Sequence, residues 1–488
     1  MSENKPYKPN LSKSLFQRGL NCHKSLYLHK YHPELCDEIS ESQETQFQAG
    51  IDVGLYAQKL FPNGVFITFE NIPEQIEKTM QEINQVTHTL YEPAFNYDNV
   101  FSKIDILHKG ELGWDMYEVK MGTSLKAEYI DDVAIQYYVL KGAGIDVSKA
   151  FVVHINNQYI RNGEIEVDKL FAIKDVTENV KEKQDFVIDE INKMREMLKG
   201  DMPGIEIGPQ CKCDFGGYCW KHIPEDSVLK LRGKGVNKFE LYRKGILRLE
   251  EIPLDILNRE QRIHVESFLK KNEFIDRDSI KAFLDSLWYP MCFLDFETTF
   301  MTPIPMFDST RPYQKVPFQY SLHYLESENS ELKHSEYLAP AGVNPLKEFA
   351  EKLLKDVPDN ACILVYKESF EKEILNNLKE WFPEYSNKID MRINNIRDLM
   401  KPFKNKDFYD WKMYGSYSLK NVLPSVITNM SYEGMEINEG EKACQAYLRM
   451  FCSQNSEEIE RIRKALLEYC NLDTLAMVKI VEKLKTLI

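Results

Sequence analysis

The sequence lacks both a long apolar segment and the pattern of an export signal. No apolar run approaches the roughly 20 residues of a membrane-spanning helix. The N-terminal stretch MSENKPYKPNLSKSL has no apolar core of the kind that secretory signals contain. We therefore expect a cytoplasmic protein that does not associate with membranes.

The chain also lacks low-complexity tracts, repeats with a period of roughly 20 to 50 residues, and an excess of positive charge. Its formal net charge of −14 argues against a protein that coats nucleic acid. A nuclease is not excluded, because its acidic site needs only local basic patches around it. With 488 residues, of which 43% are hydrophobic and 12% aromatic, the chain is long and apolar enough for two or three domains.

The pattern of apolar residues predicts an α/β protein with three blocks. Residues 1–222 run from a lysine-dotted N-terminus to a cysteine cluster and contain strand-like alternation. Residues 223–285 look wholly helical. Residues 286–488 open with the strand-like run MCFLDF and end in a long amphipathic helix.

Three of the ten cysteines crowd into GPQCKCDFGGYCW, at residues 208–220. In a reducing compartment, clustered cysteines bind metal more often than they form disulfides. A metal ion or iron–sulfur cluster usually takes four protein ligands, and Cys22, in a basic segment near the chain start, is the candidate for the fourth. A centre bound by Cys22, Cys211, Cys213 and Cys219 would tie the start of the first block to its end.

A zinc site that uses His222 or His23 is an alternative. The one-residue gap between Cys211 and Cys213 is, however, tighter than the spacing usual in zinc sites. Unrelated thiols are a third interpretation. We expect ordinary, partly buried thiols at the six scattered positions Cys36, Cys292, Cys362, Cys444, Cys452 and Cys470.

The stretch NVFSKIDILHKGELGWDMYEVKMG predicts a hairpin with a turn at KGELG. Asp105 falls in the first strand, and Glu118 and Lys120 point to the same face of the second. Such residues can hold Mg²⁺ or Mn²⁺ and stabilise charge on a phosphate. The next helix, DDVAIQYYVLKGAG, carries Gln136 towards the same site. The alternative is a solvated hairpin with an incidental ion pair and an exposed Gln136 amide.

The first block resembles the Cas4-like, RecB-type PD-(D/E)XK nucleases over most of residues 10–222. Gly54 and Leu140 stand where that family commonly has a histidine and a tyrosine. The resemblance implies a restriction-endonuclease-like fold, a [4Fe–4S] cluster on the four cysteines, and a metal-dependent DNase that acts on single-stranded ends. The matching features are SLFQRGLNCHKSLYL, FQAGIDVGLYAQKLFPNG, the terminal cysteines, Asp105, Glu118, Lys120 and Gln136.

In the middle block, LRGKGVNKFELYRKGILRLEEIP resembles a helix-hairpin-helix element. That resemblance implies contacts to phosphates without sequence readout. A plain helical linker is the alternative. The basic side chains of this element and of the residue just before it are Lys230, Arg232, Lys234, Lys238, Arg243 and Lys244.

In the third block, CFLDFETT sets Asp295 and Glu297 on one face of an apolar strand. Buried charges need partners, so two acids on the same side of such a strand indicate metal ions. Far downstream, Tyr469 and Asp473 lie four residues apart on one helix face. With Glu371, which follows another apolar strand, they predict a site for two divalent ions in which Tyr469 positions the attacking water.

This block resembles the DEDD exonucleases of the ribonuclease H-like fold, in the variant with a tyrosine four residues before the last aspartate. That family has an asparagine and an aspartate where this sequence has Lys367 and Glu371, and Asp398 is a second candidate for the middle acid. The stretches STRPYQKVPFQYSLHYL and YGSYSLKNVLP also resemble bacterial proteins of unknown function that join a Cas4-like half to this half.

The predicted function is a metal-dependent nuclease with two nuclease-like domains that processes DNA ends in repair, recombination or defence. We expect single-stranded DNA or DNA ends as its partner, and 3′→5′ digestion by the third block. Two alternatives stay open. One is a clamp that binds nucleic acid with one or both sites degenerate, and the other is an exonuclease that acts on RNA.

Overall fold

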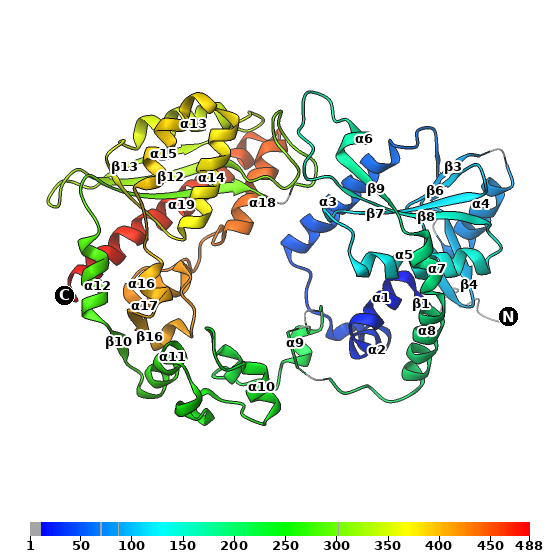
Figure 1. Cartoon of the computed structure of the whole chain (residues 1–488), viewed down its shortest axis with the longest axis horizontal. Helices are drawn as coiled ribbons and strands as arrows, with labels where there is room; N and C mark the ends of the chain where they lie inside the picture. Colours follow the sequence, from blue (N-terminus) through cyan, green and yellow to red (C-terminus); the bar gives the residue numbers. More distant parts are fainter. Residues whose placement is uncertain are drawn as a thin grey trace. The chain divides into compact units, whose positions relative to one another are not determined.

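The computed structural model of the chain describes residues 11–68, 71–85, 87–205, 207–209, 211, 213–300 and 302–488 (Figure 1). Helices and mixed sheets confirm the predicted α/β class. The contacts divide the chain into two compact units: unit 1 is Met1–Lys221 with Thr302–Tyr313, and unit 2 is His222–Met301 with Gln314–Ile488. Among the described helices, none combines the length and apolar character that a membrane crossing requires.

Unit 1 contains a mixed six-stranded sheet in the order β2-β3-β6-β7-β8-β9 and a three-stranded sheet in the order β1-β5-β4. The predicted hairpin is confirmed, since β6 and β7 pair antiparallel. Strand β7 then pairs parallel with β8. The strands are β1 (Leu11–Ser12), β2 (Val65–Phe66), β3 (Thr89–Tyr91), β4 (Ala94–Tyr97), β5 (Val100–Lys103), β6 (Ile106–Lys109), β7 (Trp114–Lys120), β8 (Val147–Ile155) and β9 (Phe171–Asp175).

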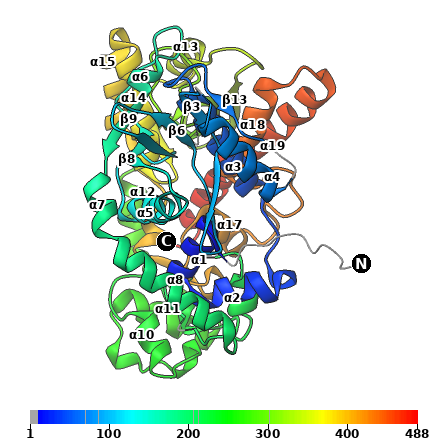
Figure 2. The same cartoon turned by 90° about the vertical axis from the view of Figure 1, so that its right-hand side faces the viewer.

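Helix α5 (Ala127–Gly142) connects the parallel strands β7 and β8, as such a pair requires a crossover. Its residues 133–137, 139 and 140 are buried, because the sheets, α1 and α8 all pack on it. Helix α8 also lies beside α1 and α2 (Figure 2). The other helices of unit 1 are α1 (Lys13–Asn21), α2 (His23–Tyr31), η1 (Pro33–Leu35), α3 (Glu41–Gln58), α4 (Ile72–Ile83), α6 (Val167–Leu170), α7 (Thr177–Glu182), α8 (Gln184–Lys199) and α9 (Gly216–Cys219).

The segment Thr302–Tyr313, which we call the strap, belongs to unit 1 although it comes late in the sequence. The Arg161 guanidinium donates to the carbonyl oxygens of Pro305 and Met306 at 3.0 and 2.8 Å. The Tyr313 hydroxyl donates to the carbonyl oxygen of Met121 at 2.5 Å. Ile304 and Tyr313 also pack against a hydrophobic cluster of this unit. The predicted boundary at residue 222 therefore leaves out a part of unit 1.

Unit 2 is built on a five-stranded sheet in the order β13-β12-β11-β14-β15. The pairs β13–β12 and β12–β11 are antiparallel, whereas β11–β14 and β14–β15 are parallel. A second sheet contains β10 and β16. The strands are β10 (Glu273–Ile275), β11 (Met291–Thr299), β12 (Val316–Leu325), β13 (Lys333–Leu338), β14 (Cys362–Val365), β15 (Ile396–Asp398) and β16 (Phe408–Asp410).

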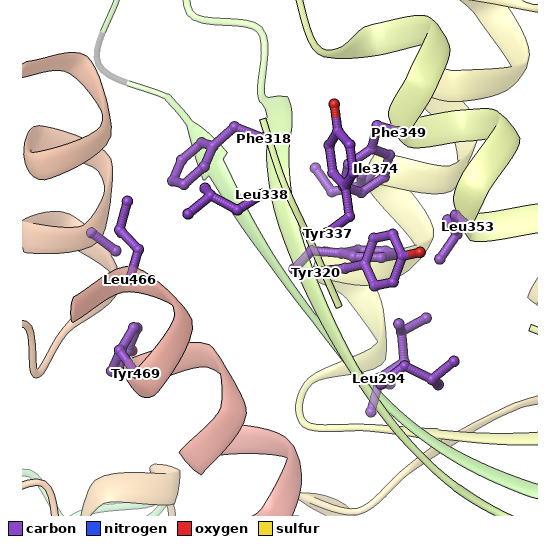
Figure 3. Close-up of a cluster of buried hydrophobic side chains, with 14 of the residues drawn as sticks. Leu294, Phe318, Tyr320, Tyr337, Leu338, Phe349, Leu353, Ile374, Leu466 and Tyr469 are labelled. Carbon is purple, nitrogen blue, oxygen red and sulfur yellow. The ribbon is translucent and has the colours of Figure 1, made fainter. Parts of the chain in front are cut away.

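Helices cover both faces of the five-stranded sheet. Figure 3 shows Phe349 and Leu353 on one side of it and Leu466 and Tyr469 on the other. The predicted long terminal helix is confirmed as α19. The helices are α13 (Leu346–Asp356), α14 (Glu368–Trp381), η5 (Pro383–Tyr385), α15 (Ser386–Asn394), α16 (Lys401–Lys404), η6 (Trp411–Met413), α17 (Leu419–Val426), α18 (Gly440–Cys452) and α19 (Ser456–Lys485).

The expectation that residues 223–285 are wholly helical is wrong. This segment contains β10, which pairs with β16 from the third block, and short 3₁₀ turns separate its helices. The helix-hairpin-helix resemblance also lacks its first helix, because only the three-residue turn η2 precedes the GKG turn. Its elements are η2 (Val228–Lys230), α10 (Lys238–Arg243), η3 (Leu249–Glu251), η4 (Leu254–Ile256), α11 (Arg259–Lys270) and α12 (Arg277–Asp285).

Candidate active sites

The acids of unit 2 come together from elements far apart in sequence. Strand β11 presents Asp295 and Glu297 on one face, and α19 packs on that face and supplies Asp473. A carboxylate oxygen of each of the three lies within 4.8 Å of the others. The register of β11 against β12 shifts between Glu297 and Thr298. Such irregularities re-aim side chains and are common next to functional sites.

These carboxyl groups are hard to ionise as they stand. Burial and the charge of Asp473 raise the pKa of Asp295 well above its usual range. Burial and both aspartates do the same to the pKa of Glu297. Burial raises the pKa of Asp473 to about 7, although the hydroxyl of Tyr432 donates a hydrogen bond to it. Within the described ranges, no lysine or arginine forms an ion pair with any of the three.

Glu371 is a fourth acid, which interacts electrostatically with Asp295 but lies outside the group of three. It lies in the first turn of α14 and is 1% exposed. Its Oε2 atom is buried without a hydrogen-bond partner. Burial and the charges of Asp295 and Asp398 raise its pKa well above the usual range. A buried oxygen without a partner is costly, so this carboxylate is suited to a cation.

Asp398, the other candidate for the middle acid, already accepts hydrogen bonds from backbone N–H groups. Its Oδ1 accepts hydrogen bonds of 3.0 Å from the N–H groups of both Lys367 and Met400. These bonds fix the turn in which α14 begins. The geometry therefore favours Glu371 over Asp398 as the site acid.

Two tyrosines contact the last acid of the cluster. Tyr469 lies one turn before Asp473 on α19, and its hydroxyl lowers the pKa of that aspartate through a hydrogen bond. Tyr432 donates a hydrogen bond to Asp473 Oδ1, and the two tyrosine rings lie 6.0 Å apart. Sequence reasoning missed Tyr432, because no spacing links a loop residue 41 positions upstream to α19.

The candidate site of unit 1 centres on Glu118, which is 1% exposed. Its Oε1 lies 2.8 Å from Lys120 Nζ and 2.6 Å from Lys13 Nζ. Its Oε2 accepts a 2.6 Å hydrogen bond from Gln136 Nε2. Gln136 is buried, which contradicts the interpretation of an exposed amide. Asp105 lies just before β6 rather than within a strand, and its Oδ2 accepts from the N–H of Val119 at 2.6 Å.

The two acids of unit 1 differ in charge state. Burial opposes the ionisation of Glu118, but Lys13 and Lys120 lower its pKa to about 2. Burial and the charge of Glu118 raise the pKa of Asp105 to about 7, against the opposing effect of Lys13. Paired acids whose pKa values are pushed apart are characteristic of sites that move protons.

Lys13 and Asp132 are further residues that the sequence did not point to. Lys13 is the first residue of α1 and lies more than one hundred residues before Glu118 in the sequence. Asp132, which belongs to α5, forms an ion pair with Lys120. Both depend on which helices pack against β7, so only the three-dimensional structure reveals them.

The four predicted cluster cysteines gather in unit 1. Cys22 lies between α1 and α2, and it lines one cavity of about 820 Å³ together with Cys211 and Cys213. Burial raises the pKa of the Cys219 thiol, and the nearby charges of the other three raise it further. None of the ten cysteines, all of which lie in the described ranges, forms a disulfide.

An ion pair ties the same two segments together. The Arg18 guanidinium contacts both carboxylate oxygens of Asp214, at 2.5 and 2.8 Å. Arg18 comes from α1 and Asp214 follows Cys213 directly. The alternative zinc ligand His222 belongs to unit 2, where its Nε2 lies 2.8 Å from the Tyr242 hydroxyl.

Unit 2 thus holds a buried acidic cluster, and unit 1 holds a carboxylate–lysine cluster with four neighbouring thiols. Over residues 292–418, the chain matches the model of a family described as a domain of unknown function, DUF2779. The matched segment includes Asp295, Glu297 and Glu371 and ends before Tyr469 and Asp473. No curated protein matches the chain.

Proposed function

We propose that the protein is a metal-dependent nuclease with one candidate site in each unit. One observation carries this proposal: Asp295, Glu297 and Asp473 are gathered in unit 2, the buried Glu371 lies close enough to Asp295 to feel its charge, and in the described ranges no lysine or arginine is paired to any of the four. Like charges in an interior need compensation. Carboxylate oxygens are the ligands that Mg²⁺ and Mn²⁺ prefer, and the unpartnered Oε2 of Glu371 fits that role.

Two divalent ions at this position would activate a water molecule and stabilise the oxygen that leaves a phosphodiester. The hydroxyl of Tyr469, beside Asp473, is suited to orient that water. Acids on the central strand of a mixed sheet, with the last acid on the final helix, are compatible with the ribonuclease H-like arrangement that the resemblance implies.

In unit 1 we assign the corresponding roles to Asp105 and Glu118 as metal ligands and to Lys120 as the cation that stabilises charge on the phosphate. Gln136 holds the Glu118 carboxylate in place. This assignment is compatible with the restriction-endonuclease-like fold that the resemblance implies.

A [4Fe–4S] cluster fits the four thiols better than zinc does. Four thiolates at about 2.3 Å from one zinc ion would lie roughly 3.8 Å apart. In the described part of the chain, no three cysteine sulfurs come within 4.8 Å of one another. A cluster binds each thiolate to a different iron atom and so needs a wider spacing. When bound, it would cross-link the start of unit 1 to residues 211–219.

The test is a cleavage assay on the full chain. Purified protein with Mn²⁺ should shorten 5′-labelled single-stranded DNA from its 3′ end, and Asp295→Ala should abolish this digestion. Single-stranded RNA of the same sequence, assayed in parallel, decides between the two substrates. Wild-type protein that neither binds Mn²⁺ nor digests either strand would refute the proposal.

A non-cleaving clamp is the second candidate for unit 1 alone. It is favoured by Lys13, whose Nζ lies 2.6 Å from Glu118 Oε1 and so competes with any metal ion for that oxygen. If unit 1 is such a clamp, Lys120→Ala will weaken the binding of single-stranded DNA without changing any cleavage.

A further inference from the structure

Lys367 lies at the edge of the unit 2 sheet that also carries the site acids. Strands β11 and β14 pair parallel, and the last pair in their register is Phe293 with Leu364. Strand β14 ends at Val365, so the chain leaves the sheet close to the level of Asp295 on β11. In open α/β sheets, ligands bind outside the carboxyl ends of the strands. Lys367 therefore follows β14 at the edge that is suited to a ligand.

The backbone of Lys367 is in the left-handed region, with φ 91° and ψ 73°. A residue with a Cβ atom is disfavoured there, whereas glycine and asparagine adopt this conformation more readily. Asp398 helps to fix the conformation, because its Oδ1 accepts a 3.0 Å hydrogen bond from the Lys367 N–H. Local backbone preference therefore does not account for a lysine at this position. Residues held in such conformations cluster at functional sites.

The ammonium group of Lys367 is exposed and forms no ion pair within the described part of the chain. Its charge nevertheless reaches the site, because it opposes the rise in the pKa of Glu371 that burial causes. Three other lysines near α14 are paired with glutamates of that helix: Lys372 and Lys401 with Glu368, and Lys315 with Glu373. Lys367 differs from them in being available to an anion that enters beside the acids.

We propose that Lys367 binds the substrate in the site of unit 2, through an ion pair between its ammonium group and a non-bridging oxygen of the phosphate. The inference rests on the proposed function and adds a substrate-binding residue to it. Ionised carboxylates only accept hydrogen bonds, so a phosphate beside Asp295 and Glu371 needs a cationic donor. The family that this block resembles has asparagine here, which suits the backbone but carries no charge. The lysine is therefore a feature of this chain and not of that family's pattern.

The experiment is an isothermal titration of full-length protein in Mn²⁺. The probes are dTMP and UMP, which carry a phosphate but no phosphodiester to cleave, and thymidine and uridine, which lack the phosphate. Lys367→Asn and Lys367→Gly remove the charge and suit the left-handed backbone, whereas Lys367→Arg keeps the charge. The matched control is Lys271→Asn, because Lys271 is also an exposed lysine with a left-handed backbone (φ 51°) in unit 2. All proteins carry Lys120→Ala, which disables the candidate site of unit 1.

Lys367→Asn and Lys367→Gly should bind dTMP or UMP about tenfold more weakly, because they lose a charge-assisted hydrogen bond. Lys367→Arg and the control should bind like the parent protein. Neither of the uncharged variants should have a lower melting temperature, since asparagine and glycine fit the left-handed backbone. Undiminished nucleotide binding by Lys367→Asn would overturn the proposal. So would an equal loss with thymidine and uridine, because that loss would not involve the phosphate.

Cleavage of 5′-labelled single strands in Mn²⁺ tests the proposed function separately. In the Lys120→Ala background, Lys367→Asn should lower kcat/KM about tenfold, in line with the loss of binding. Cleavage that Lys367→Asn leaves unchanged would overturn the inference while the nuclease stands. A parent protein that binds the nucleotides through Lys367 but cleaves neither DNA nor RNA would refute the nuclease and leave the phosphate site in place. A parent protein that binds neither dTMP nor UMP would exclude the site.

Discussion

Gln136 donates a 2.6 Å hydrogen bond from its side-chain amide to Glu118 Oε2. The same nitrogen also donates to the carbonyl oxygen of Lys103 at 3.1 Å. Gln136 of α5 thus holds one carboxylate oxygen of Glu118, and Lys13 and Lys120 hold the other. A carboxylate fixed in this way keeps one orientation.

Replacement of Gln136 by leucine should destabilise the protein by about 1–3 kcal/mol, because Glu118 Oε2 would lose its partner in the interior. Urea denaturation monitored by circular dichroism measures this loss. The exposed amide variant Gln158→Leu is the control and should change stability little. An unchanged unfolding midpoint for Gln136→Leu would contradict the role that we assign to this bond.

Replacement of Lys13 by alanine should strengthen metal binding in unit 1. Lys13 occupies Glu118 Oε1, so its removal frees that oxygen and leaves Lys120 in place. Isothermal titration with Mn²⁺ in an Asp295→Ala background isolates this site from unit 2. Lys120→Ala should abolish cleavage by unit 1 in the same background. Weaker Mn²⁺ binding by the Lys13→Ala variant would show that this lysine supports the site instead.

The pH dependence of the metal-free protein should reflect the acids of unit 2. Asp473 has a pKa of about 7 in the fold against an ordinary value of 3.8, so the native state holds more protons than the unfolded state between these values. Stability should therefore fall as the pH rises from 4 to 7. Mn²⁺ binds the ionised acids, so its stabilising effect should grow over the same range.

Thermal melts with EDTA and with Mn²⁺, taken from pH 5 to 8, check this prediction. Asp295→Asn should raise the melting temperature of the metal-free protein at pH 8, because it removes one of the repelling charges. It should also remove most of the Mn²⁺ effect. Asp201→Asn, at an exposed position, is the control. A stabilisation by Mn²⁺ that does not depend on pH would contradict the assignment.

Loss of the carboxylate charge should affect mainly digestion at Glu371 and mainly the stability of the protein at Asp398. Glu371→Gln should abolish 3′→5′ digestion with little loss of stability, because its Oε2 has no partner to lose. Asp398→Asn should mainly destabilise the protein, because its carboxylate accepts two backbone hydrogen bonds. Glu371→Asp should impair digestion if the longer side chain is matched to the site. Normal digestion by the Glu371→Gln variant would exclude it as a ligand.

Protein purified without oxygen should be brown and should contain about four iron atoms per chain. Cys22→Ser should remove the iron and loosen unit 1, since as a ligand of the proposed cluster this residue would join α1 to the segment at residues 211–219. Cys362→Ser, in a buried strand of unit 2, should retain the iron. Colourless protein with one zinc ion per chain would refute the cluster.

The sequence was sufficient to predict those site residues that lie close to each other along the chain. Asp295 and Glu297 alternate on one strand, and Tyr469 and Asp473 are one helical turn apart, so each pair can be read without a tertiary structure. The class of fold and the terminal helix were predictable for the same reason. Asp105 was misplaced by one residue, because the chain bends between β5 and β6.

The residues that sequence reasoning missed depend on packing between distant segments. Lys13 reaches Glu118 because α1 packs against α5, and Tyr432 reaches Asp473 from a loop. The choice between Glu371 and Asp398 depended on hydrogen bonds that no sequence pattern encodes. The pairing of β10 with β16 likewise joins segments more than one hundred residues apart.

The strap has a consequence for any attempt to divide this protein. The chain passes between the units after Lys221, after Met301 and after Tyr313. A gene truncated at residue 221 would encode unit 1 without Ile304 and Tyr313, which belong to one of its own hydrophobic clusters. Co-expression of 1–221 with 222–488 would instead supply the missing piece in trans, and the two polypeptides should assemble as a split protein. Two intact chains that exchange straps would form a domain-swapped dimer by the same contacts.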